Sequence, residues 1–285
     1  MTATLERAPI RHRSRLWWAP YLGIAAIVGY CLSPFYWMLV SSLRRTNDIF
    51  DSSPVPAPLS LDSYAAAFAA NNGFVRALGN SFLVAGITTV LVLLIGTLTA
   101  YALARLDFRF KNLVLAVIIT TSMFPGISLL VPLLELFSGI GWINTYQAMI
   151  VPSMSFALPL AVWNLTAFFR QMPVELEEAA QIDGCTPAQA FRKVILPLAA
   201  PGVFTTAIIT FIAAWNEFII ALSVVNKKDL KTAPVITSQF TGTTQFDAPF
   251  GTQMAAGVIV TIPLVILVLL FQRRIVAGLT AGGVK

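Results

Sequence analysis

The chain has 285 residues, of which 57% are hydrophobic and 11% are charged, whereas about 25% of residues are charged in an average soluble domain. This composition excludes a water-soluble fold, and several uncharged runs exceed the ~20 residues that a helix needs to cross a bilayer. The net charge of +6 requires no nucleic-acid partner, because membrane topology already places basic residues in cytoplasmic loops. We therefore expect an all-α polytopic membrane protein with six transmembrane helices and both termini in the cytoplasm.

Histidine and cysteine are too sparse for a catalytic or metal-binding site. The one histidine, His12, lies in the basic N-terminal tail, and the two cysteines, Cys31 and Cys185, lie in different regions without a paired or metal-ligand spacing. We expect no catalytic residue, no metal ion and no cofactor bound by this chain.

The N-terminal half contains three expected spans. Residues 1–16 form a basic tail that we place in the cytoplasm. Residues 44–79 should be an external segment with a short amphipathic helix near Leu61–Ala70, because their charges are balanced. The expected spans are the uncharged runs at about residues 17–43, 80–104 and 112–134.

The third of these runs contains Pro125-Gly126. Proline and glycine at membrane depth unwind a helix locally, and this is tolerated only against protein or a water-lined cavity. Two interpretations stay open at this point, a purely structural kink and a bend that lines a pore.

The C-terminal half adds three spans and completes a transmembrane domain over residues 17–272. Residues 226–253 should form an external loop, and residues 273–285 a cytoplasmic tail. The expected spans lie at about residues 148–169, 201–225 and 254–271.

Glu217 is the one carboxylate inside an expected span. An ionisable residue in a membrane is expected to face a cavity or a polar partner, so Trp215, Asn216 and Glu217 are candidates for a pathway or gate. The alternative is a structural hydrogen bond from Glu217 to Asn216 or to a neighbouring span.

The distribution of basic residues tests this topology. Of the 19 lysines and arginines, 13 lie in the four segments that we place in the cytoplasm, namely the two tails, the loop at residues 105–111 and the segment at residues 170–200. This bias supports six spans with both termini inside.

The segment at residues 170–200 is the only long stretch in which acids, bases and small residues gather between two apolar runs. It predicts two short helices separated by Gly184, since glycine readily adopts the left-handed conformation that ends a helix. The second helix should begin at Thr186, with Pro187 at its first position and Gln189 at the spacing of a capping box. We expect an elbow of two helices on the cytoplasmic side.

The spacing inside this elbow resembles the EAA loop of ABC-importer permeases. It reads Glu178-Ala179-Ala180, three residues, Gly184, nine residues, Val194, one residue and Leu196-Pro197, with valine in place of the usual isoleucine. Two further motifs resemble the MalG-type permeases of carbohydrate importers, Trp215-Asn216-Glu217-Phe218 and the terminal Leu279-Thr280-Ala281-Gly282-Gly283-Val284-Lys285. The resemblance covers essentially the whole chain.

The resemblance implies the type I ABC importer permease fold, in which the elbow is a coupling helix that docks on a cytoplasmic ATPase. Glu178 would form an ion pair with the ATPase, supported by Asp183, and two small alanines would seat in its cleft. The coupling residues implied in this way are Glu178, Ala179, Ala180, Asp183, Gly184, Leu196 and Pro197. The tail residues implied to contact the ATPase dimer are Thr280, Gly282, Gly283 and Lys285.

The chain lacks the G-x-x-x-x-G-K-[ST] phosphate loop, so we expect it to be no enzyme, and ATP and Mg²⁺ to be bound by a separate ATPase. The resemblance also implies a second, MalF-like permease, an extracytoplasmic sugar-binding protein and the lipid of a bacterial inner membrane as partners. The expected function is to form half of the pathway for a sugar, a di- or oligosaccharide. The alternatives are a secondary transporter or channel subunit, and an ABC importer of a non-sugar solute such as a glycerol phosphodiester.

Overall fold

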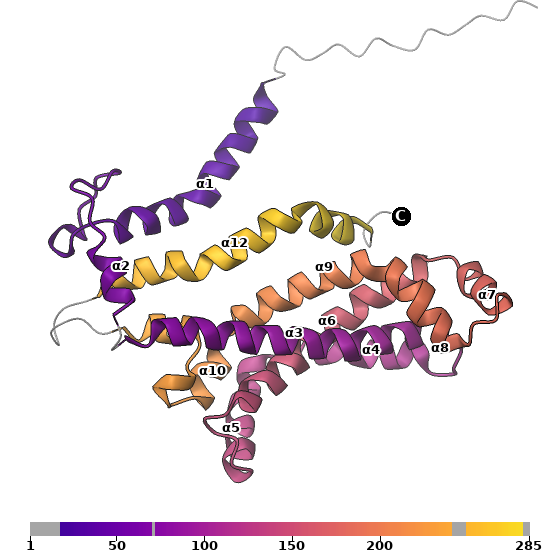
Figure 1. Cartoon of the computed structure of the whole chain (residues 1–285). Helices are drawn as coiled ribbons and strands as arrows, with labels where there is room; N and C mark the ends of the chain where they lie inside the picture. Colours follow the sequence, from indigo (N-terminus) through magenta and orange to yellow (C-terminus); the bar gives the residue numbers. More distant parts are fainter. Residues whose placement is uncertain (1–17, 70–71, 241–248, 282–285) are drawn as a thin grey trace, which may run out of the picture.

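The computed structural model describes residues 18–69, 72–240 and 249–281. In this part of the chain the regular structure is helical throughout (Figure 1). Five helices are long and apolar enough to cross a membrane, and a bent pair of shorter helices makes a sixth span if it is counted as one. The expected all-α membrane fold is confirmed.

The five long helices overlap five of the six expected spans, and four of them extend beyond the uncharged runs at one or both ends. They are α1 Ala19–Ser42, α3 Phe74–Arg105, α6 Tyr146–Gln171, α9 Leu196–Trp215 and α12 Phe250–Ala281. Between α1 and α3, η1 covers Thr46–Asp48 and α2 covers Asp62–Ala67. The backbone N–H of Asp62 donates to the hydroxyl of Ser60 at 3.0 Å, and α2 is shorter than the amphipathic helix we expected.

The third expected span, 112–134, is not one helix. It consists of α4 Lys111–Thr121, a 3₁₀ turn η3 Gly126–Leu129 and α5 Leu130–Gly139, and the two halves are bent by 85°. The break falls at Pro125, whose backbone is extended and which has no N–H to continue the helical ladder. The predicted local unwinding is therefore a complete break (Figure 1).

The fifth expected span, 201–225, is wrong at both ends. A continuous helix starts at Pro187, runs through α8 Pro187–Ala190 and a π-helical turn η4 Phe191–Ile195, and ends with α9 at Trp215. A separate short helix, α10 Ile219–Val224, then leads into η5 Lys228–Leu230 and α11 Ala233–Ser238. Hydropathy alone joins α9 to α10, because only Asn216, Glu217 and Phe218 separate two strongly apolar helices.

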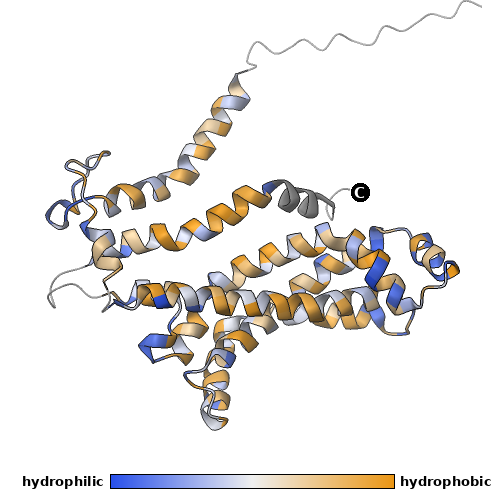
Figure 2. Ribbon diagram, in the orientation of Figure 1, coloured by the Kyte–Doolittle hydropathy of each residue, from blue (hydrophilic) through white to orange (hydrophobic). Residues whose placement is uncertain are grey.

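Helices α3, α6 and α9 pack together as the centre of the molecule, and α12 lies beside α9 (Figure 1). Close approach of α6 and α9 depends on Gly202, where a Cβ atom would lie 2.7 Å from the ring of Phe168. Apolar residues dominate α1 and the Phe250–Gln272 part of α12 (Figure 2), and both are largely exposed. Such surfaces suit lipid or another membrane subunit.

Candidate functional site

The elbow consists of α7 Glu175–Ile182 and α8, and it lies at one end of the helical bundle (Figure 1). Gly184 has φ +90°, the left-handed conformation that favours glycine. Its N–H donates to the carbonyl of Gln181, and the N–H of Cys185 donates to the carbonyl of Ala180, both at 3.0 Å. These two bonds form the Schellman motif that ends an α-helix.

The capping box predicted for the second elbow helix is present. The N–H of Gln189 donates to the Thr186 hydroxyl at 3.3 Å, and the N–H of Thr186 donates to the Gln189 side chain at 2.9 Å. Backbone groups at both sides of the turn are therefore satisfied within the elbow itself. The predicted helix–glycine–helix elbow is confirmed.

The two faces of α7 have different surroundings. Glu177 and Ala180, one helical turn apart, are buried against the rest of the chain at 9% and 7% exposure. Glu178 and Ala179 are exposed, and Ile182 is 86% exposed. The two alanines of the motif therefore differ, and Ala180 does not lie on the free surface where a partner would seat.

Glu177 joins the elbow to α3. One of its carboxylate oxygens lies 2.8 Å from Nε of Arg105, and the other accepts a hydrogen bond from the hydroxyl of Tyr101 at 3.1 Å. Arg105 also donates from Nη2 to the carbonyl of Met172 at 2.8 Å, just after α6. Sequence reasoning missed this cluster, because nothing in the sequence pairs residues that lie so far apart.

The remaining residues of the coupling motif lie on the elbow or just after it. Asp183 is exposed at the C-terminal end of α7, Leu196 is half-buried, and Pro197 is exposed at the start of α9. One residue, Leu196, separates Pro197 from the end of the π-helical turn. A π turn changes the hydrogen-bond pattern where a proline cannot donate, so the helix continues through this residue.

The C-terminal candidates fall largely outside the described residues. The backbone of Thr280 belongs to the last turn of α12. Gly282, Gly283 and Lys285 lie outside the part of the chain that the structure describes.

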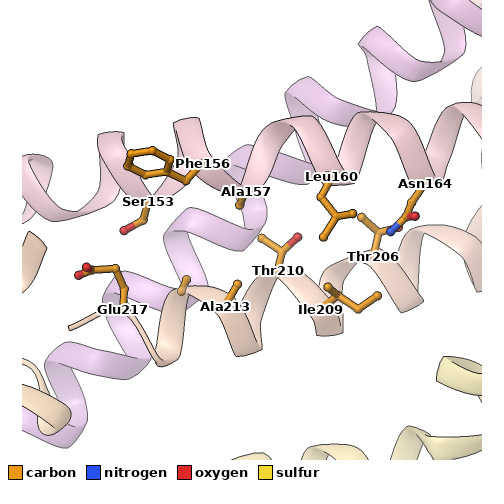
Figure 3. A pocket seen from close by; sticks show the side chains of 12 residues that line it. Ser153, Phe156, Ala157, Leu160, Asn164, Thr206, Ile209, Thr210, Ala213 and Glu217 are labelled. Carbon is orange, nitrogen blue, oxygen red and sulfur yellow. The ribbon is translucent and has the colours of Figure 1, made fainter. Parts of the chain in front are cut away.

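A groove runs between α6 and α9, with a cavity volume of about 160 Å³. Its lining residues recur about once per helical turn on one face of each helix. Ser153 and Glu217 lie at one end of the groove, and Asn164 and Thr206 lie at the other (Figure 3). Its polar lining residues are Ser153, Asn164, Thr206, Thr210 and Glu217, and its small ones are Ala157, Ala161, Ala213 and Ala214.

The three pathway candidates in the Trp-Asn-Glu motif have different places. Glu217 lines the groove, and its carboxylate accepts hydrogen bonds from the N–H groups of Ile220 and Ala221 at 2.7 and 3.0 Å. It therefore caps α10, and these hydrogen bonds come from the backbone of α10 rather than from Asn216 or a neighbouring span. Asn216 is exposed and donates to the carbonyl of Ile212.

Trp215 is a packing residue. It is 1% exposed, its indole N–H donates to the carbonyl of Val260 on α12 at 3.3 Å, and its ring meets that of Phe82 on α3 at 4.7 Å. It thus ties α9 to α3 and α12 and does not line the groove.

Sequence relatives cover nearly the whole chain. A trehalose transport system permease protein, SugB of Mycobacterium tuberculosis, is 47% identical over 91% of this chain and 94% of its own length. A trehalose/maltose transport system permease protein, MalG of Thermococcus litoralis, is 40% identical over 93% of this chain and 95% of its own length.

A solved structure shows the same fold. A bacterial ABC transporter involved in the import of the acidic polysaccharide alginate contains a chain with a TM-score of 0.77 and 19% identity, covering 93% of this chain and 99% of that one. The model of the family described as "binding-protein-dependent transport system inner membrane component" matches residues 92–280. The chain therefore belongs to the family of inner membrane components of binding-protein-dependent transport systems.

Proposed function

We propose that the chain forms one half of the pathway through which an ABC importer carries a sugar, and that its elbow is the contact with the ATPase. The names of its trehalose and maltose relatives support a sugar, a di- or oligosaccharide. Membership of the family removes a secondary transporter and a channel from the alternatives. The coupling role rests on one observation. The outward face of α7 is exposed, and the turn between α7 and α8 is capped on both sides.

The elbow has the physical properties of a docking element. Glu178 offers a charge, Ala179 leaves room for a partner surface, and Ile182 offers an apolar contact that is 86% exposed. A rigid element of this kind loses little conformational entropy on binding. In this proposal an ATPase dimer that holds ATP and Mg²⁺ lies in the cytoplasm, on the side of the elbow and of both chain termini, as the distribution of basic residues supports.

The groove between α6 and α9 is the part of this chain that we assign to the pathway. Its hydroxyl, amide and carboxylate groups suit hydrogen bonds with sugar hydroxyls, and its alanines leave space beside them. One such chain supplies one side of a pathway, so a second, MalF-like permease would supply the other. An extracytoplasmic binding protein would deliver the solute from the end opposite the elbow.

The lining of the groove also favours a sugar over the remaining alternative, a glycerol phosphodiester. Among the residues that line it, the one charged side chain is the carboxylate of Glu217, which repels an anion. With the complete importer and its binding protein in vesicles, we expect a neutral disaccharide to stimulate ATP hydrolysis and a glycerol phosphodiester not to. Stimulation by the phosphodiester alone would contradict the sugar assignment.

The coupling assignment is tested by charge reversal. In vesicles that contain both permeases, the ATPase and the binding protein, we expect Glu178→Arg to reduce sugar uptake by at least about tenfold, because breaking a docking charge pair costs about 2–5 kcal/mol. Asp107→Arg is the matched control, since Asp107 is an exposed acid whose surface pair with Lys111 contributes little. Full uptake by the Glu178→Arg complex would overturn the assignment.

We also propose that the C-terminal residues Thr280, Gly282, Gly283 and Lys285 contact the ATPase dimer. Deleting residues 280–285 should lower uptake while the amount of permease in the membrane stays the same. Unchanged uptake by the shortened chain would contradict this contact.

A further inference from the structure

Helix α3 is held by a polar cluster near each of its ends. At the elbow end lies the elbow clamp, which we define as Tyr101, Arg105 and Glu177. At the other end lies the loop clamp, which we define as Asn80 and Ser81 with the backbone of residues 229–233. Neither cluster belongs to the coupling motif or to the groove.

The elbow clamp joins three elements. The side chains of Arg105 and Glu177 are 7% and 11% exposed, and their closest atoms lie 2.8 Å apart. Tyr101 and Arg105 belong to α3, Glu177 belongs to α7, and the Met172 carbonyl that Arg105 also binds follows α6. Separating a buried ion pair leaves an uncompensated charge and strongly destabilises the protein. Helix α7 should therefore move together with the end of α3.

The loop clamp fixes a backbone segment to the other end of α3. The Asn80 amide donates to the carbonyls of Asp229 and Lys231, both at 2.9 Å. Its oxygen accepts a hydrogen bond from the Tyr146 hydroxyl at 2.8 Å. Ser81 is 2% exposed, and its hydroxyl accepts from the N–H of Ala233 at 2.8 Å. These bonds use both the oxygen and the nitrogen of the Asn80 amide.

The helix between the clamps is suited to transmit displacement. Asn80 and Arg105 are separated by roughly 37 Å along the axis, at ~1.5 Å per residue. Of the five long helices that the structure describes, α3 alone has no proline within its bounds. Proline is the commonest cause of sharp helix kinks, so α3 is expected to move as one rigid body.

We propose that α3 is a connecting rod that couples the segment at residues 229–233 to the elbow, with Glu177, Arg105 and Asn80 as positioning residues. This inference rests on the proposed function, in which the elbow contacts the ATPase and the opposite end faces the binding protein. The clamps then relay the docking of the loaded binding protein to the ATPase. Neither clamp touches the sugar or ATP.

The experiment measures sugar transported per ATP hydrolysed, and the stimulation of ATP hydrolysis by the loaded binding protein, in the complete importer in vesicles. We expect Glu177→Gln to lower both values by at least about tenfold in complexes that still assemble. Asn80→Ala, at the far end, should lower the same two values. The matched control is Arg76→Gln on α3, which removes an exposed ion pair between Arg76 and Asp229 of η5 and should change neither value.

Two further variants separate coupling from folding. The charge swap Arg105→Glu with Glu177→Arg restores a pair of opposite charges and should recover part of the lost stimulation. Tyr101→Phe removes one hydroxyl and keeps the ring contacts with Phe169 and Phe191, so it should assemble normally and lower stimulation by about threefold.

The inference is overturned if Tyr101→Phe and Asn80→Ala complexes both keep the stimulation and the transport per ATP of the unmodified protein. It is also overturned if Glu177→Gln lowers uptake only in proportion to the amount of assembled complex. These results are distinct from a failure of the proposed function, for which Glu178→Arg would also have to transport normally.

Discussion

Two neighbouring glutamates on α7 show how the position on a helix decides what a residue does. Glu177 is 9% exposed and lies in a cluster with Arg105 and Tyr101, whereas Glu178 is exposed. Successive residues point about 100° apart around an α-helix. One carboxylate therefore holds the elbow to its own chain, while the next is free to meet another protein.

The largest expected effect comes from removing the buried member of this pair. Glu177→Ala leaves the guanidinium of Arg105 buried without its counter-ion, and we expect the free energy of unfolding to fall by about 3–5 kcal/mol. Glu178→Ala should change it by less than about 0.5 kcal/mol. Thermal or denaturant unfolding of the purified complex measures both, and equal losses would refute the contrast between the two faces.

A smaller effect is expected at Gly184, in the turn that ends α7, the helix that carries both glutamates. Gly184 has φ +90°, a conformation that costs a residue with a side chain about 1–2 kcal/mol. Gly184→Ala should lower the stability of the complex by that amount. Gly139→Ala is the control, since an added Cβ there has no atom within 4 Å and the backbone has no positive φ; a loss as large in that control would mean that the turn is not the cause.

The smallest effect is expected at the start of the second elbow helix. Thr186→Ala removes the capping hydroxyl and should cost about 1 kcal/mol, whereas Thr186→Ser keeps a hydroxyl and should cost less. The unfolding midpoints of the two variants check this order. The reverse order would show that the methyl group of Thr186, rather than its hydroxyl, stabilises the elbow.

Local signals were sufficient to predict the elbow from the sequence. Glycine at the left-handed position and the Thr186–Gln189 spacing act within a few residues, so neighbouring sequence determines them. The pairing of Glu177 with Arg105 depends on how α7 packs against α3, and no local pattern encodes it. The resemblance treated Ala179 and Ala180 alike, because a motif carries no information on which face of α7 is covered.

The membrane spans show the same difference between features set by local sequence and features set by helix packing. Uncharged runs located the five long helices, but the fifth run hid the end of α9, because Glu217 caps α10 inside an apolar stretch. The groove is lined by one face of α6, with Ser153 and Asn164 about three turns apart, and by one face of α9, with Thr206 and Thr210 about one turn apart. That these two faces meet was not predictable, since it depends on the packing of the helices.

The most direct test of the account is disulfide cross-linking of the elbow to the ATPase. Cysteine is placed at Ala179 or at Ala180 in a chain that also carries Cys31→Ser and Cys185→Ser, and single cysteines are placed in the ATPase subunit of an importer active in transport. We predict cross-links from Ala179→Cys, which is on the exposed face, and none from Ala180→Cys, which is buried. Equal cross-linking from both positions, or none from either in a transporting complex, would contradict it.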